Sequence, residues 1–256
     1  MEATRANLFF AKGVIIVEGD AENLLIPTIA EIIGKPLHRY GVSIVNVGST
    51  AFKRYADIFK RKDGSDFGVP VSIISDLDVR ALEYYKAKGK EYPDGIAGAS
   101  DLEKARATKK KGIEDANNEG EIHIYLPNQW TLEYEIVCSK LQKYLFCAVY
   151  VAKRENNKKF LYEEALLKAN EEWAKKYSNN SSGETDVEVR QRAYDIFSEL
   201  DDGNVSKAAT AQYLADMLNK QYQKEIGDNS ESTIKYILEH DPYLQYIIDA
   251  IKHVTK

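Results

Sequence analysis

Runs of apolar, β-branched residues at two places along the chain predict two buried strands. The first run covers residues 14–17 (Val-Ile-Ile-Val) and the second covers residues 71–75 (Val-Ser-Ile-Ile-Ser). Continuous apolar runs of this kind are typical of parallel sheets with both faces covered. Residues 42–47 have a similar character, whereas residues 121–126 alternate polar and apolar positions like an edge strand. The pattern therefore predicts an α/β fold built on a parallel sheet.

Apolar positions at helical spacing predict the helices that flank this sheet. Residues 23–34 form one such segment, in which Gly34 is a natural stop. Pro27 is compatible with that helix only near its first turn, unless the helix is kinked. A second helix is expected at residues 52–59.

Further along, Ser100 and Glu103 are spaced as a capping box for a helix that runs to about residue 117. A long apolar helix is expected to follow residue 130 and to end near residue 151. The segment from residue 130 to residue 151 thus closes the part of the chain in which strands and helices alternate.

From residue 152 onward the pattern predicts helices only. Thr185 and Glu188 are spaced as another capping box, and Asp241–Pro242 is typical of an N-cap followed by proline at the first helical position. We therefore expect a sheet-containing core at residues 1–150 and a mainly helical region at residues 151–256.

Composition places the chain among ordinary soluble proteins. It has 256 residues, of which 44% are hydrophobic and 29% charged, with a net charge of −5. There is no apolar run of the roughly 20 residues that span a bilayer and no signal-peptide pattern, so we expect a cytoplasmic protein without membrane contact. Cys138 and Cys147 lack metal-ligand spacing and are expected to be buried free thiols. The first strand begins close to Met1, which suggests a piece of a longer chain.

Acidic side chains follow both buried strands. Glu18 and Glu22 come directly after the first strand, and Asp76 and Asp78 follow the second. The carboxyl ends of parallel strands meet at one edge of a sheet, and side chains at i and i+2 of a strand share a face. We therefore expect Asp76 and Asp78 to converge on one point, close to Glu18 and Glu22.

Carboxylate oxygens are hard ligands that suit Mg²⁺ or Mn²⁺. Glu133 or Glu135, at the start of the long apolar helix, is a further candidate ligand. The acids are numerous enough for two ions about 3.5–4 Å apart, an arrangement that activates water and stabilises a leaving oxygen of a phosphodiester. Surface acids at strand ends are the simpler explanation for any one of these residues, but not for all of them together.

Basic residues lie near the predicted acidic edge. Lys53 and Arg54 belong to the most basic helix of this part of the chain, and they are candidates for contact with nucleic acid, although a solvated face explains them as well. The turn at residues 48–50 (Gly-Ser-Thr) is a weak candidate for binding phosphate through backbone amides. The run at residues 109–111 fits either a phosphate contact or simple solubility.

Three segments together resemble a Toprim domain: Val-Glu-Gly-Asp-Ala-Glu at residues 17–22, Asn-Val-Gly-Ser-Thr at residues 46–50 and Ser-Asp-Leu-Asp at residues 75–78. They are most similar to the carboxy-terminal nuclease region of the OLD (overcoming lysogenization defect) family, to which the nuclease of Gabija-type phage defence systems is related. The resemblance covers most of residues 10–140 and implies a Toprim-type parallel sheet flanked by helices, with a helical subdomain.

The resemblance also implies roles for individual residues. Glu18 and Glu22 match the first acidic motif, and Asp76 and Asp78 match an Asp-x-Asp pair. Thr131 and Glu133 match a Ser/Thr-x-Glu element that contributes further metal ligands, with threonine where the family often has serine. Lys207 matches a catalytic lysine, which implies that the helical region returns to the active site around this residue. Glu18 and Lys207 are thus the expected catalytic residues.

The implied function is metal-dependent hydrolysis of DNA with two Mg²⁺ or Mn²⁺ ions, by nicking or by cleavage. The family also implies an amino-terminal ABC-type ATPase region in the full-length chain, and a helicase-like partner if the chain is of the Gabija type. This chain has no Walker-type glycine loop and is not expected to hydrolyse ATP alone.

Two alternatives remain open. The first is a haloacid-dehalogenase-like phosphatase with Asp76 as nucleophile. The second is a Toprim module that binds nucleic acid without catalysis.

Overall fold

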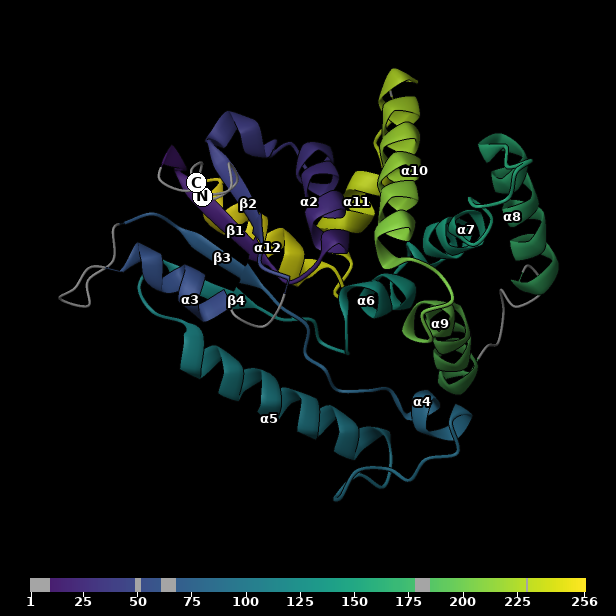
Figure 1. The fold of residues 1–256 in the computed structure, drawn as a ribbon, viewed down its shortest axis with the longest axis horizontal. Coiled ribbons are helices and arrows are strands. Elements are labelled where there is room, and N and C mark those ends of the chain that lie inside the picture. Colours follow the sequence, from purple (N-terminus) through teal and green to yellow (C-terminus); the bar gives the residue numbers. More distant parts are fainter. Residues whose placement is uncertain (1–9, 49–51, 61–67, 178–184, 229) are drawn as a thin grey trace.

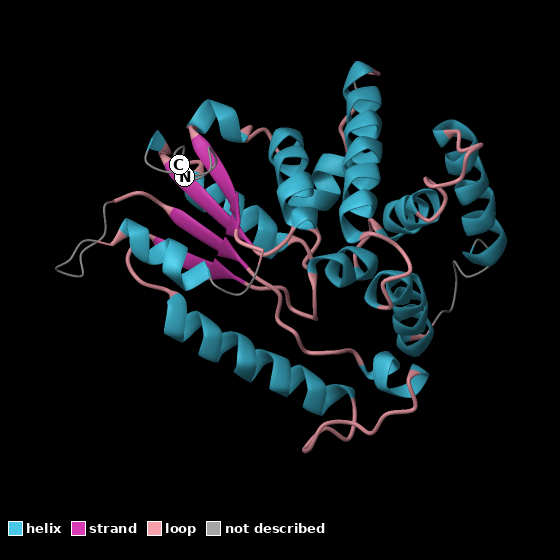
Figure 2. Ribbon diagram, in the orientation of Figure 1, coloured by secondary structure: helices cyan, strands magenta, loops and turns pink. Residues whose placement is uncertain are grey.

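A four-stranded parallel sheet lies at the centre of the fold. The computed structural model describes residues 10–48, 52–60, 68–177, 185–228 and 230–256. The strand order is β2-β1-β3-β4, and all neighbouring strands are parallel. The strands are β1 (Gly13–Val17), β2 (Val42–Asn46), β3 (Val71–Ile74) and β4 (Ile122–Tyr125). The predicted parallel sheet is confirmed, and all four carboxyl ends lie at one edge (Figure 2).

Burial along the strands follows the sequence pattern. Every residue of the central strands β1 and β3 is buried, while β4 alternates between buried and half-buried positions at the edge of the sheet. Because side chains alternate across a strand, Ile15 and Val17 enter one apolar cluster, and Val14 and Ile16 enter the other. Both faces of the sheet are therefore covered.

A different set of helices covers each face of the sheet (Figure 1). The larger cluster contains residues of α2 (Asp20–Ile32) and of α12 (Gln245–Val254). The smaller cluster on the other face contains Ala56 from α3 (Phe52–Ala56) and Phe59, and Ile113 from α5 (Ala99–Asn117) packs against it. The other elements are α4 (Leu82–Ala87), α6 (Leu132–Cys138), α7 (Gln142–Ala152), α8 (Tyr162–Tyr177), α9 (Asp186–Asp201), α10 (Lys207–Gly227), α11 (Thr233–His240) and the short 3-10 helices at Leu37–Tyr40 and Asp57–Phe59.

The carboxy-terminal part of the chain returns to the sheet. Ser72 Oγ in β3 donates a hydrogen bond to the carbonyl oxygen of Ala250 in α12 at 2.8 Å. The ring of His253 stacks on that of His123 in β4, with centroids 4.6 Å apart. The predicted boundary at residue 150 falls inside α7, and residues on both sides of it share the larger apolar cluster. The division into regions 1–150 and 151–256 stays a prediction.

Three local predictions are corrected. The long apolar helix is two helices, because Ser139 is extended and its Oγ accepts from the amide of Leu141 at 3.0 Å. The Ser100–Glu103 capping box does not form: α5 begins at Ala99 after Gly98, without a side-chain cap.

The third correction concerns Asp241, which does not cap α12. That helix begins at Gln245, and the Asp241 carboxylate accepts from the amides of Lys140 and Tyr243 instead. By contrast, the Thr185–Glu188 capping box of α9 is confirmed.

Both cysteines are free thiols, as predicted; Cys147 is buried, whereas Cys138 is only half-buried. Among the described residues, none of the helices combines the length and the apolar character that crossing a bilayer requires.

Candidate active site

A hollow of about 250 Å³ lies where the carboxyl ends of β1 and β3 meet the first turns of three helices. The helices are α2, α6 and α10, which come from widely separated parts of the chain. The residues that line the hollow are Glu18, Gly19, Asp20, Ala21, Glu22, Asp76, Glu133, Lys207 and Ala208. The structure thus brings together five of the residues predicted for the site: Glu18, Glu22, Asp76, Glu133 and Lys207.

Glu18 and Glu22 reach the hollow because α2 starts directly after β1. The helix begins at Asp20, so these two residues lie about one turn apart, and Pro27 is accommodated inside the helix. Gly19 leaves room for the second acid, since a Cβ atom there would lie 3.0 Å from Glu22 Oε2. The hydroxyl of Ser75 donates a hydrogen bond to Glu18 Oε1 and fixes this carboxylate.

Asp20 also lines the hollow, although the sequence did not single it out. Its Oδ1 accepts from Asn46 Nδ2 at 2.6 Å, so it is tied to the end of β2. Ser75 was missed in the same way. Both could have been identified from the sequence, because Asp20 and Ser75 lie directly beside the acids of the motifs.

Asp76 lines the hollow and Asp78 does not, although burial and, to a lesser extent, repulsion from Asp78 raise the pKa of Glu18. β3 ends at Ile74, so neither residue is part of a strand. Asp76 reaches the hollow, where its Oδ1 accepts from the amide of Leu132 at 3.2 Å. Asp78 is exposed, does not line the hollow, and has a left-handed backbone with φ of 53°. Its role as a ligand stays a prediction.

Glu133 is held in place by the start of α6. Thr131 is the N-cap of this helix, and its Oγ1 accepts from the amide of Tyr134 at 3.3 Å. The same hydroxyl donates to Glu133 Oε2 at 2.9 Å. Thr131 therefore orients Glu133 without lining the hollow itself. Glu135, the alternative candidate, does not line the hollow either, and its carboxylate accepts from the amide of Gln129.

Lys207 is the first residue of α10, which packs along α2. Its Nζ lies 3.0 Å from Glu133 Oε2, and its side chain keeps 43% of its surface exposed. Ser206 caps the helix by accepting from the amide of Ala209 at 3.2 Å. This packing brings a lysine from the helical region to the acids.

The charges in the hollow are unbalanced. Burial raises the pKa of Glu22 to about 7, with repulsion from Glu133 as the next cause. Burial, followed by repulsion from Glu133 and Glu22, raises the pKa of Asp76 well above its usual range. Burial also raises the pKa of Glu18, against the opposing effect of the Ser75 hydrogen bond. Burial lowers the pKa of Lys207, but attraction to Glu133 and Asp76 outweighs it, so the pKa is raised on balance.

A hard divalent cation fits this donor set. The hollow offers only carboxylate oxygens and one amine, and one lysine does not neutralise four buried or half-buried acids. Among the described residues, no three His, Cys, Asp or Glu side chains stand in position to hold an ion as they are placed. The fit therefore rests on the donor chemistry and on the excess of negative charge.

The predicted nucleic-acid contacts are only partly described. Arg54 is exposed on α3, while the side chain of Lys53 and the residues Ser49 and Thr50 lie outside the described part of the chain. Lys109 and Lys110 bond to backbone carbonyl groups of the chain itself: Lys109 Nζ donates to Asp78 at 3.3 Å and Lys110 Nζ to Leu126 at 2.9 Å.

Residues 9–78 match the family model described as overcoming lysogenization defect protein-like, TOPRIM domain. The chain is 19% identical to the C-terminal region of the Burkholderia pseudomallei OLD protein, with a TM-score of 0.48 over 97% of this chain and 100% of that one.

It is 21% identical to the C-terminal region of the Xanthomonas campestris pv. campestris OLD protein, with a TM-score of 0.46 over 97% of this chain and 94% of that one. No curated protein matches it. The segment matched by the family model contains β1, β2 and β3 and four of the predicted acids: Glu18, Glu22, Asp76 and Asp78.

Proposed function

We propose that the chain is a metal-dependent nuclease that hydrolyses DNA phosphodiester bonds at the hollow, a proposal supported by the match of residues 9–78 to the OLD-like TOPRIM domain model. The observation that carries the proposal is the meeting of Glu18, Glu22, Asp76 and Glu133 with Lys207 in one hollow. These residues come from four parts of the chain that are far apart in sequence. A cluster of buried like charges destabilises a fold, so its presence favours a functional role.

The proposed cofactor is Mg²⁺ or Mn²⁺, in two ions held by Glu18, Glu22, Asp76 and Glu133, with Asp78 and Thr131 as further predicted ligands. When bound, such ions lower the pKa of water and neutralise charge on the departing oxygen. The protein residues have separate tasks. Glu18, whose pKa is raised by burial, is suited to accept a proton from the attacking water.

Lys207 is suited to donate hydrogen bonds to a phosphate oxygen. Its amine faces the hollow and remains charged at neutral pH, because attraction to Glu133 and Asp76 keeps its pKa high. A fixed cation in a site with little water stabilises the additional negative charge of the transition state. Thr131 has a positioning role, since it orients Glu133.

The acidic hollow itself repels DNA, so binding requires basic residues around it. We propose Lys53 and Arg54 for this contact, with an affinity that falls as salt rises. The same family likeness supports a partnership with an ABC-type ATPase region. The phosphatase alternative gains no support, since it leaves Glu18, Glu22 and Glu133 beside Asp76 without a task.

The proposal is tested with Asp76→Asn and supercoiled plasmid. This change keeps the size of the side chain and an acceptor for Leu132, and removes the charge. We expect cleavage by the unaltered protein in Mn²⁺, none in EDTA, and at least a hundredfold slower cleavage by Asp76→Asn, roughly the scale of losing one electrostatic element of a site. Asp94→Asn is the matched control because Asp94 is exposed and lies outside the hollow. Equal cleavage by Asp76→Asn and Asp94→Asn would overturn the proposal.

A further inference from the structure

Helix α5 is held against the rest of the molecule mainly by polar side chains. It has 19 residues, yet only Leu102 and Arg106 are buried. A helix that packs on a sheet ordinarily buries a continuous apolar stripe. Figure 1 shows α5 running along one side of the molecule, below α3 and β4. Apart from Leu102 and from Ile113, which packs against the smaller apolar cluster, the helix is placed by polar contacts.

Arg106, Lys109 and Lys110 make these contacts from one face of α5, since residues three and four apart are neighbours on a helix. Arg106 is only 7% exposed. One terminal nitrogen of its guanidinium donates to the side-chain oxygen of Gln129, and the other lies 3.5 Å from the carbonyl oxygen of Val79. Lys110 Nζ donates to the Leu126 carbonyl at 2.9 Å and to Asn128 Oδ1 at 2.7 Å.

The segments that α5 contacts carry the acids of the proposed active site. Residues 76–79 contain Asp76, and residues 126–131 lead directly into the turn that presents Glu133. The two segments also bond to each other, since the amides of Leu77 and Asp78 donate to the Trp130 carbonyl at 2.9 and 3.3 Å. The Leu132 amide closes the unit by donating to Asp76 Oδ1 at 3.2 Å.

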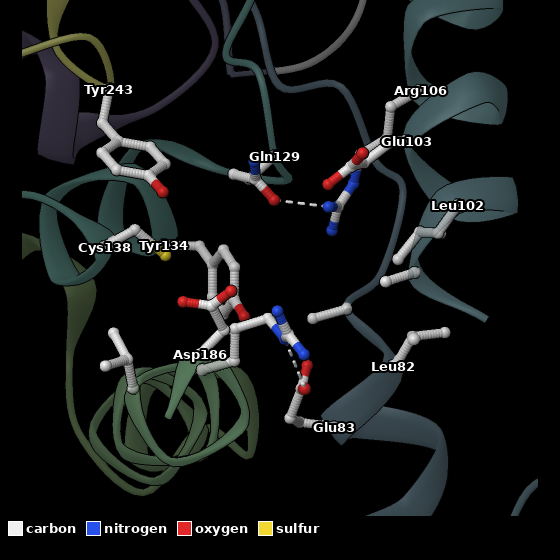
Figure 3. Close-up of a pocket in the computed structure, with 14 residues that line it drawn as sticks. Leu82, Glu83, Leu102, Glu103, Arg106, Gln129, Tyr134, Cys138, Asp186 and Tyr243 are labelled. Atoms are coloured by element: carbon white, nitrogen blue, oxygen red, sulfur yellow. Dashed lines mark hydrogen bonds and ion pairs between the residues drawn. The ribbon is translucent and has the colours of Figure 1, made fainter. Parts of the chain in front are cut away.

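The Arg106 side chain also faces a pocket. Arg106 lines a pocket of about 290 Å³ between α5, α6 and α9. In Figure 3 its guanidinium points toward Gln129, across the pocket from Glu83. Its Nε has no hydrogen-bond partner among the described residues. The terminal nitrogens of the guanidinium thus supply its fixed contacts, and they connect α5 to both acid-bearing segments.

We propose that Arg106 and Lys110 are positioning residues that set the places of Asp76 and Glu133: Arg106 links α5 to both acid-bearing segments, and Lys110 anchors residues 126–131 to the same helix. This inference rests on the proposed function of the hollow. Burying a guanidinium is costly unless its hydrogen bonds are made, and a well-packed apolar residue often gives a more stable protein. The gain from Arg106 is a defined geometry, because its planar group bonds to two separate segments at once.

Lys110 and its neighbour Lys111 provide a matched test. Lys111 is exposed, whereas Lys110 is half-buried and fixed to Leu126 and Asn128. We expect Lys110→Met to lower kcat about tenfold or more with little change in KM, since small displacements of reacting groups are costly. We also expect the Leu77 and Leu132 amides to exchange hydrogen about tenfold faster, because local opening becomes easier. Lys111→Met should leave kcat and the exchange of both amides unchanged.

Arg106→Lys gives a second, independent variant. It keeps the charge, but a single amine cannot take the place of the planar fork between Gln129 and Val79. We expect faster exchange of the Leu77 and Leu132 amides and a lower kcat. Arg39→Lys, at an exposed position outside both segments, is the control.

Amide exchange is measured without metal or DNA, so it tests the clamp even if the chain cleaves nothing. Absence of cleavage by the unaltered protein would count against the proposed function alone. Unchanged exchange of both amides in Lys110→Met and Arg106→Lys would overturn the clamp.

Discussion

At the scale of single residues, the ion pair between Lys207 and Glu133 links the helical region to the acids. The pair is 3.0 Å long, and Lys207 is the one basic side chain among the described residues that line the hollow. The carboxylate that it contacts is also bound by the Thr131 hydroxyl. Lys207 therefore has two effects that can be measured separately: its charge partly neutralises the acids of the hollow, and its amine is proposed to act in DNA cleavage.

Replacing Lys207 by glutamine should slow DNA cleavage by about a hundredfold or more, on the scale of losing one preorganised electrostatic donor. Affinity for Mn²⁺ should be unchanged or slightly higher, because the lysine is not a ligand and competes with the ion for Glu133. Cleavage rates and calorimetric titration with Mn²⁺ measure the two effects. Lys224→Gln is the control, because Lys224 lies on the same helix but is exposed and outside the hollow. A Lys207→Gln protein that cleaves at the unaltered rate would show that this lysine is not catalytic.

Glu22 should make the metal-free protein less stable as pH rises. Burial raises its pKa from 4.5 to about 7 in the folded state, so ionisation opposes folding. Its contribution to stability is complete below pH 4.5 and is lost as pH rises through about 7. At 1.36 kcal/mol per pKa unit, the loss is on the order of 3 kcal/mol.

The measurement is the free energy of unfolding by urea in EDTA at several pH values between 5 and 8. Glu22→Gln should flatten this part of the profile and make the protein more stable at pH 8. Glu171→Gln, at an exposed position of α8, should leave the profile as it is. Identical slopes for Glu22→Gln and the unaltered protein would contradict the assignment.

At the scale of helices and strands, the sequence predicted best what local pattern determines. β1 and β3 were predictable because their apolar runs need no knowledge of partners. The break between α6 and α7 was not predictable. It depends on the hydrogen bond from the Leu141 amide to Ser139 Oγ and on the one from the Lys140 amide to Asp241, which is distant in sequence. The same carboxylate explains why α12 begins later than expected.

The residues of the candidate site also differ in how far local sequence pattern could predict them. The sequence predicted that Glu18, Glu22 and Asp76 lie near one another, because the carboxyl ends of parallel strands meet at one edge of a sheet. Asp78 lies beyond the end of β3 at Ile74, so strand alternation does not place it, and its role as a ligand stays a prediction. Lys207 was found only through the family resemblance, since its approach depends on how α10 packs along α2.

Arg106 and Lys110 were not identified as site residues at all. A basic run on a helix ordinarily faces solvent, and nothing local distinguishes Lys110 from Lys111. Only the acceptors at Leu126 and Asn128, in another part of the chain, set the two lysines apart.

At the scale of the whole molecule, the hollow depends on parts of the chain that are far apart in sequence. The apolar cluster under the hollow combines β1, α2, α6, α7, α9, α10 and α12. Within it, α12 contacts β1, β3 and β4 directly. A shared core of this extent favours unfolding as one unit, in which damage to the carboxy-terminal helix also destabilises the sheet.

Replacing Ile248 by alanine tests this shared core. Ile248 is completely buried in α12, so Ile248→Ala should lower the free energy of unfolding by about 2–5 kcal/mol. The loss should be the same by far-UV circular dichroism and by tryptophan fluorescence, because one cooperative transition changes both signals together. The fluorescence reports on both regions, since Trp130 lies three residues before Glu133 and Trp173 lies on α8. Ile226→Ala is the control: Ile226 is 42% exposed on α10, and its removal should cost less than about 0.5 kcal/mol. If Ile248→Ala instead produced two separate transitions, with only one of them shifted, residues 151–256 would fold independently and the shared core would not be a single cooperative unit.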